Sequence, residues 1–251
     1  ALQNLIRNRS AQLGMILIGF LLLTAIFAPV LATHDPIAPL FGVEGEVPPL
    51  PRKPPCIPAF GCEEPLHIMG LDANARDLWS RVVYGARISL TVGMAAVSFA
   101  IVTGTTIGLV AGYAGGWVDN VVMRFMDVMM AFPALLLAIA IVTIFGRGLQ
   151  NALLAIAIVS IPTYARITRA SVLSIKEMEF VLAERALGAG PVRIAVAQVL
   201  PNALTPLIVQ GTLGIGTAIL DAAALSFLGL GAQPPTPEWG FMLSEARINL
   251  R

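Results

Sequence analysis

The sequence predicts an all-α integral membrane protein, built as a multi-span helical bundle. Of its 251 residues, 57% are hydrophobic and only 12% are charged, whereas a soluble domain carries about 25% charged residues. The mean hydropathy is +0.81. Long uncharged stretches recur along the chain, and a helix satisfies its own backbone hydrogen bonds in lipid. These observations together exclude an ordinary soluble domain.

Five uncharged stretches are each long enough to cross the bilayer, which takes about 20 apolar residues in a helix. They are Ala11–Thr33, Ile88–Val118, Val128–Gly146, Gly148–Ala165 and Ala195–Leu220. The first stretch could instead be a signal peptide. Its apolar run exceeds the typical signal-peptide core of about 7–15 residues, so we interpret it as a permanent helix.

Basic residues predict the orientation of these spans. Arg7 and Arg9 precede the first span, which places the N-terminus in the cytoplasm. Alternation then puts the basic segment 166–193 on the cytoplasmic side and the long connection 34–87 outside. The predicted organisation is a cytoplasmic N-terminus with the first helix (1–33), an external proline-rich loop (34–75), and a membrane core with a cytoplasmic segment at 166–200 (76–251).

The external loop contains the only two cysteines, Cys56 and Cys62. They lie on the side predicted to be oxidising, so a disulfide is the natural interpretation. A metal site made from these thiols and His67 is the alternative. No further ligand lies nearby in the sequence, so we predict no metal site.

The residues after the loop predict an amphipathic helix along the membrane surface. In "ARDLWSRVVYGARISL", the side chains expected to face lipid and those expected to face water alternate with helical spacing. Leu78, Val82 and Val83 form the first set, and Asp77, Arg81 and Arg87 form the second.

Segment 177–200 predicts two short helices joined by a glycine bend. Phe180, Ala183 and Leu187 recur at helical spacing and form one apolar face. Gly188 and Gly190 suit the end of a helix, and Pro191 suits the first turn of the next. An ordinary polar loop with accidental periodicity is the alternative.

The stretch "FVLAERALGAGPVRIAVAQVLPN" resembles the Glu-Ala-Ala loop of bacterial ABC-type import permeases, and most of all the second permease subunit of the dipeptide, oligopeptide and nickel group. Three further segments resemble the same family in the same order. They are "MGLDANARDLWSRVVYGARISLTVG", "GLVAGYAGGWVDNVVMRFMDVMMAFPALLLAIAIV" and "LSFLGLGAQPPTPEWGFMLSEAR". The resemblance implies a bundle of the type I ABC importer (MetI-like) kind.

The same resemblance implies a coupling role for the loop, which in the family docks onto an ATP-hydrolysing subunit. The implied coupling residues are Ala183, Glu184, Arg185, Ala186, Leu187, Gly188, Ala189 and Gly190. The implied partners are a homologous permease subunit in a heterodimer, two ABC ATPase subunits, an external substrate-binding protein and membrane lipid. This chain would bind no cofactor, since ATP and magnesium would belong to the partner subunits. The implied location is the bacterial inner membrane.

Three features depart from the family pattern. The Glu-Ala-Ala positions fall on Leu182, Ala183 and Glu184, with a glutamate where a small residue is usual. The acid at Asp221 stands one position before the family acid, at Ala222. The family also has a further transmembrane helix after the segment that ends near Arg247, so we expect a sixth helix beyond the given chain.

The sequence contains no phosphate-binding loop and no paired acid and base, so we predict a non-enzymatic subunit. It also lacks a basic run that would bind nucleic acid. Polar residues within the spans are candidates for the transport pathway, and we select Ser160, Gln210 and Asp221. The glycines at 104, 108 and 112 predict close helix packing.

Three classes of function remain open at this point. The first is an ABC import permease whose cargo is peptide, or alternatively nickel or another small solute. The second is a secondary transporter, which would predict inverted repeats and an acid-rich midplane, and neither is found in the sequence. The third is a membrane scaffold without a transport role.

Overall fold

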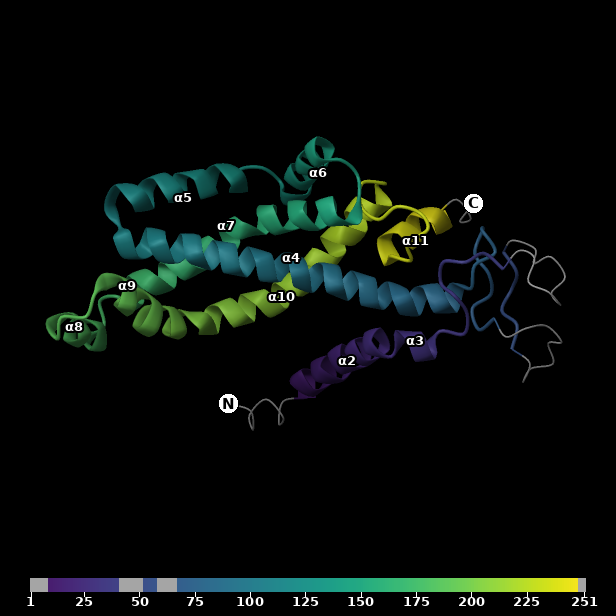
Figure 1. The fold of residues 1–251 in the computed structure, drawn as a ribbon, viewed down its shortest axis with the longest axis horizontal. Coiled ribbons are helices and arrows are strands. Elements are labelled where there is room, and N and C mark those ends of the chain that lie inside the picture. The colour runs from purple at the N-terminus through teal and green to yellow at the C-terminus, as the bar shows by residue number, and fades with distance from the viewer. Residues whose placement is uncertain (1–8, 41–51, 58–66, 248–251) are drawn as a thin grey trace. The chain divides into compact units, whose positions relative to one another are not determined.

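The computed structural model describes residues 9–40, 52–57 and 67–247 (Figure 1). Within these ranges the chain is helical, and its two isolated β-bridges join Cys56 with His67 and Leu71 with Asp77. The helices are α2 (Arg9–Ile26), α3 (Ala28–Leu31), α4 (Leu78–Ala114), α5 (Gly116–Met130), α6 (Ala134–Phe145), α7 (Leu149–Ile175), α8 (Glu179–Ala186), α9 (Pro191–Arg193), the π-helix η2 (Ile194–Val199), α10 (Leu200–Phe227) and α11 (Trp239–Ala246). The chain divides into two compact units, Ala1–Thr91 with Ser226–Arg251 (unit 1) and Val92–Leu225 (unit 2). The predicted all-α membrane class is confirmed.

Three helices in the described residues are long and apolar enough to cross a membrane. They are α4, α7 and the continuous helical run Pro191–Phe227. The pair α5 and α6 would make a fourth crossing if it counts as one span. The apolar part of the N-terminal helix covers only Ala11–Ile26 and is shorter than a typical crossing. The structure therefore supports three to four of the five predicted spans by length and composition.

The predicted third span, Val128–Gly146, is not a straight helix. Helix α5 ends at Met130 and α6 begins at Ala134, with a bend of 94° between them, which is visible in Figure 1. Pro133 lies in the break as the residue before α6. Proline has no N–H to donate, and it disfavours the helical conformation of the residue before it. The bend thus has a local cause in the sequence.

The predicted surface helix at 75–90 is wrong in two respects. Its helical part belongs to α4, which continues without a break to Ala114. Asp77 and Arg81, which we expected to face water, are fully buried in unit 1. The burial is possible because both side chains have hydrogen-bond partners from residues distant in the sequence.

Close packing within unit 2 follows the predicted glycine positions on α4. A Cβ atom on Gly108 would lie 2.3 Å from the carbonyl oxygen of Ala165 in α7. A Cβ atom on Gly104 would lie 2.7 Å from Cβ of Tyr164, and one on Gly112 would lie 3.1 Å from Val172. The prediction that these glycines mark helix packing is confirmed.

An ion pair also joins two helices of unit 2. The guanidinium of Arg169 in α7 donates two hydrogen bonds, from Nε and Nη2, to the two carboxylate oxygens of Asp119 in α5. The N–O distance is 2.5 Å in each. Arg166 donates to Asp127 in the same pair of helices. Bidentate arginine–carboxylate pairs fix geometry as well as charge, so α5 is held against the half of α7 that leads into segment 177–200.

Candidate functional site

Segment 177–200 contains the short first helix and the glycine bend that the sequence predicts, but the predicted second helix is not short, because it continues without a break to Phe227. Helix α8 ends at Ala186, and α9 begins at Pro191 and passes through η2 into α10. Figure 1 shows α8 and α9 together at one end of unit 2, where α7 ends and α10 begins. Contacts between α8 and η2 hold the two parts against each other. We call this segment the coupling segment.

A buried side chain anchors α8. Val181 is 0% exposed and belongs to a hydrophobic cluster contributed by α7, α8, η2 and α10. The other members are Val172, Ile175, Ile194, Val199 and Ala203. Burying a valine contributes about 1.5–3 kcal/mol. Helix α8 is therefore packed on the end of α7 and the start of α10.

The predicted apolar face of α8 points away from this cluster. Phe180, Ala183 and Leu187 are all exposed, and Leu187 has 84% of its surface accessible. Successive helical residues differ by about 100°, so Val181 turns inward while Phe180 stays outside. The spacing identifies the face correctly, and the structure shows that this face is free within the described residues.

Gly188 ends α8 in a left-handed conformation, with φ of +83°. Its N–H donates to the carbonyl of Arg185, and the N–H of Ala189 donates to the carbonyl of Glu184. The N–O distance is 3.1 Å in both hydrogen bonds. This double hydrogen-bond pattern is the Schellman motif. No atom of the described residues lies within 4 Å of the position of a Cβ on Gly188. The requirement for glycine at this position comes from the backbone angle and not from lack of space.

Glu184, which departs from the family pattern, has a local partner. Its Oε1 accepts a hydrogen bond of 3.1 Å from Nε2 of Gln198 in η2. Both side chains are half-buried, as is Ala189. The remaining predicted coupling residues, Arg185, Ala186 and Gly190, are exposed together with Ala183, Leu187 and Gly188. The glutamate therefore links α8 to η2, which leaves Glu179 and Arg185 as the exposed charged side chains of α8.

The three pathway candidates are not brought together into one site. The hydroxyl of Ser160 in α7 donates a hydrogen bond of 2.8 Å to the carbonyl oxygen of Ile156 in the same helix. Gln210 and Asp221 in α10 are half-buried, and neither side chain has a hydrogen-bond or ion-pair partner among the described residues. Ala222, where the family acid would stand, is buried. The pathway role of the three residues stays a prediction.

Cys56 is buried in unit 1, and its backbone exchanges two hydrogen bonds of 2.8 Å with His67. Cys62 lies outside the described residues. The predicted disulfide between them therefore stays a prediction.

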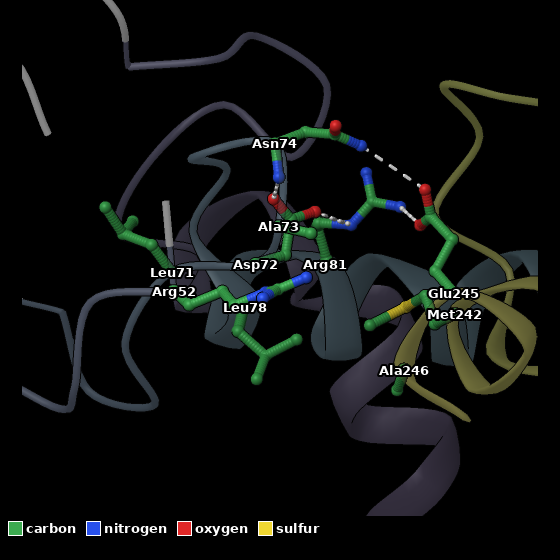
Figure 2. A pocket seen from close by; sticks show the side chains of 10 residues that line it. All are labelled: Arg52, Leu71, Asp72, Ala73, Asn74, Leu78, Arg81, Met242, Glu245 and Ala246. Atoms are coloured by element: carbon green, nitrogen blue, oxygen red, sulfur yellow. Dashed lines mark hydrogen bonds and ion pairs between the residues drawn. The ribbon is translucent and has the colours of Figure 1, made fainter. Parts of the chain in front are cut away.

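Unit 1 contains a cavity of about 260 Å³ with an ionic network along one wall (Figure 2). The guanidinium of Arg81 lies between the carboxylates of Asp72 and Glu245, with N–O distances of 3.4 and 3.3 Å. It also donates hydrogen bonds of 3.1 Å to the carbonyl oxygens of Pro36 and Pro235. The rest of the lining is Arg52, Leu71, Ala73, Asn74, Leu78, Met242 and Ala246. The network ties the start of α4 to α11. Sequence reasoning missed it because Glu245 is far from Arg81 in the chain.

A second polar cluster in unit 1 surrounds Asp77. Its Oδ2 accepts hydrogen bonds from the backbone N–H of Ser80 (2.8 Å), the hydroxyl of Ser80 (2.7 Å) and the hydroxyl of Thr33 (3.2 Å). Its Oδ1 faces the Nδ1 atoms of His67 and His34. Burial alone would raise the pKa of this carboxyl, but the hydrogen bonds from Ser80 and His67 and the charge of His34 outweigh it. The pKa of Asp77 consequently lies below its usual value, and the buried group stays an anion.

Comparisons with known proteins give a consistent result. The family described as "Binding-protein-dependent transport system inner membrane component" matches residues 104–248. A second family, the N-terminal TM domain of oligopeptide transport permease C, matches residues 1–55. The dipeptide transport system permease protein DppC of Alkalihalophilus pseudofirmus is 48% identical over 98% of this chain and 76% of its own length. The di/tripeptide permease protein DppC of Pseudomonas aeruginosa is 44% identical over 98% of this chain and 78% of its own length. A glutathione transport system permease protein GsiD of Escherichia coli is 48% identical over 73% of this chain and 61% of its own length.

The solved structures show the same fold. A chain from inward-facing conformations of the MetNI methionine ABC transporter aligns with a TM-score of 0.55, at 21% identity, over 69% of this chain and 91% of that chain. The predicted MetI-like permease fold is thus confirmed. With the family match over more than half of the sequence and near-complete coverage by the dipeptide permeases, the chain belongs to the binding-protein-dependent inner membrane components, the non-catalytic permease subunits of ABC transporters.

Proposed function

We propose that this protein is a permease subunit of an ATP-driven importer that takes up dipeptides and other short peptides. The permeases to which it is 44–48% identical over nearly its whole length are named for dipeptide and tripeptide transport. In this proposal the chain forms the translocation pathway with a homologous permease subunit. Two ATPase subunits, which bind ATP and magnesium, and an external binding protein complete the complex.

The observation that carries the mechanism is the exposed apolar face of α8. Phe180 and Leu187 are accessible on a helix that is itself fixed by the buried Val181. A rigid, exposed apolar helix face suits a groove on a protein partner. In the proposed orientation the N-terminus and the coupling segment are cytoplasmic, where an ATPase subunit would bind this face.

Coupling would then be mechanical. Helix α8 shares one hydrophobic cluster with the end of α7 and the start of α10, so movement of the ATPase would displace all three helices as a packed group. The ATPase must bind one arrangement of the permease more tightly than the other, by a few kcal/mol, to shift the population of states. The permease itself contributes no chemical step.

Photo-cross-linking tests this docking. A benzophenone amino acid placed at position 187 in the assembled complex should cross-link to the ATPase subunit. The control is the same probe at Ile144, whose exposed fraction of 82% nearly equals the 84% of Leu187 and which the proposed orientation places near the external surface. The docking proposal is wrong if position 187 gives no ATPase adduct, or if both positions give the same adduct.

Uptake by proteoliposomes that contain the complete complex tests the cargo. A labelled dipeptide should accumulate only when ATP is supplied on the ATPase side and the binding protein on the other. Excess unlabelled dipeptide should compete, whereas excess glutathione or nickel should compete weakly. Strong competition by either would assign that solute as the cargo instead. Uptake that persists without ATP and collapses with the ion gradient would indicate a secondary transporter.

A further inference from the structure

Three side chains of unit 1 that the proposed function does not use gather around one point. His34 follows α3, His67 forms the β-bridge with Cys56, and Asp77 immediately precedes α4. One ligand-type atom from each of the three lies within 4.8 Å of the other two. The two imidazole rings are tilted by 32°, and their centroids are 4.8 Å apart. Three separate stretches of the chain therefore deliver two imidazoles and a carboxylate to one place.

The carboxylate of Asp77 is held in a fixed orientation. Three hydrogen bonds, two from Ser80 and one from Thr33, all end on Oδ2. They leave Oδ1 directed at the imidazoles, 3.1 Å from Nδ1 of His67 and 3.8 Å from Nδ1 of His34. Partners that orient a ligating carboxylate in this way are a regular feature of metal sites.

The separations of these atoms suit a small metal ion. In a tetrahedral site with bonds of about 2.0–2.2 Å, neighbouring ligand atoms lie about 3.3–3.6 Å apart. The two distances to Oδ1, 3.1 and 3.8 Å, lie just below and just above that range. The side chains of His67 and Asp77 are 2% and 0% exposed, whereas that of His34 is 22% exposed. His34 is therefore the ligand with room to move inward by the small amount needed.

We propose that His34, His67 and Asp77 bind a divalent first-row transition-metal ion of the zinc type, through Nδ1, Nδ1 and Oδ1. Two imidazoles with one carboxylate suit zinc, nickel or iron, whereas magnesium and calcium prefer sites made of oxygen ligands. A water molecule or the hydroxyl of Thr33, 3.0 Å from Nδ1 of His34, would complete the coordination. The ion would fasten the segment after α3 to the start of α4, independently of the cargo and the ATPase.

Metal titration of the full-length chain in detergent, purified without a histidine tag, tests this site. Among the 251 residues given, the histidines are His34 and His67, so the imidazole ligands that the variants below remove are these two. Cobalt(II) absorption and zinc calorimetry should show one ion bound per chain. His34→Ala should weaken binding at least tenfold, and the neighbouring Asp35→Asn, which removes a carboxylate charge outside the cluster, should bind as the wild type does.

His34→Ala is the decisive variant because it leaves the hydrogen bonds to Oδ2 of Asp77 and the β-bridge of His67 in place. Zinc should raise the melting temperature of the wild type and leave that of His34→Ala unchanged. The site does not exist if the wild type binds no stoichiometric ion, or if His34→Ala binds as tightly as the wild type. A strong thiolate-to-cobalt absorption band would instead assign the ion to the cysteines and would equally overturn the proposal.

Discussion

Gly188→Val should remove at least nine-tenths of ATP-coupled uptake while the protein still inserts into the membrane. The φ of +83° at Gly188 is a conformation in which a residue other than glycine costs about 1–3 kcal/mol, and a β-branched residue fits it worst. Energies of this size match the free energies that couple two sites in a protein. A change of about 1.4 kcal/mol alters an equilibrium constant tenfold. Valine would thus change the end of α8 where the partner is proposed to dock.

Two further variants identify the backbone angle as the cause. Gly188→Asn should keep most of the uptake, because asparagine adopts the left-handed conformation several-fold more readily than other side chains. Gly19→Val, in α2, adds the same side chain at a position where its Cβ would meet no other part of the described residues within 4 Å, and uptake should be unchanged. Uptake is measured in proteoliposomes with the complete complex, and insertion by the yield of chain from membranes. Equal uptake by Gly188→Val and the wild type would show that transport does not require the left-handed end of α8 at this position.

Local chemistry explains which parts of this fold the sequence predicts. The boundary between α8 and α9 follows from a glycine that takes positive φ and a proline at the first helical position, and both signals lie within four residues. The glycines on α4 predict close packing for a similar reason, since their spacing alone places them on one helix face. Features of this kind need no knowledge of distant residues.

Pairings between distant residues could not be predicted. The spacing of Phe180, Ala183 and Leu187 defines a face of α8, but the inward direction is set by Val181 and the residues of α7 and α10 that surround it. Helical spacing placed Arg81 on the water-facing side of a surface helix, whereas in the structure it is buried beside Glu245, 164 residues away in the chain. The grouping of His34 with His67 and Asp77 has no signature in the sequence, because three separate stretches supply it.

The opposite effects of one substitution at two glycines provide the second strong prediction. Gly108→Ala should destabilise the protein, because the new Cβ would lie 2.3 Å from the backbone oxygen of Ala165 and 2.8 Å from Cβ of Thr168. Neither atom is the end of a flexible side chain, so α4 and α7 must separate. Overpacking of this kind costs about 1–3 kcal/mol, and Gly108→Leu should prevent stable folding altogether.

Gly216→Ala should have the reverse effect in α10. Its Cβ would meet no neighbouring element within 4 Å in the part of the chain that the structure describes, and replacing a glycine inside a helix by alanine gains about 0.5–1 kcal/mol. The two single-methyl variants are compared by the melting temperature of the purified chain in detergent, where the wild type should lie between them. Both substitutions add the same atoms to a helical glycine, so a difference in sign can come only from what surrounds each position. If Gly108→Ala melts at or above the wild-type temperature, then α4 and α7 do not pack through this glycine.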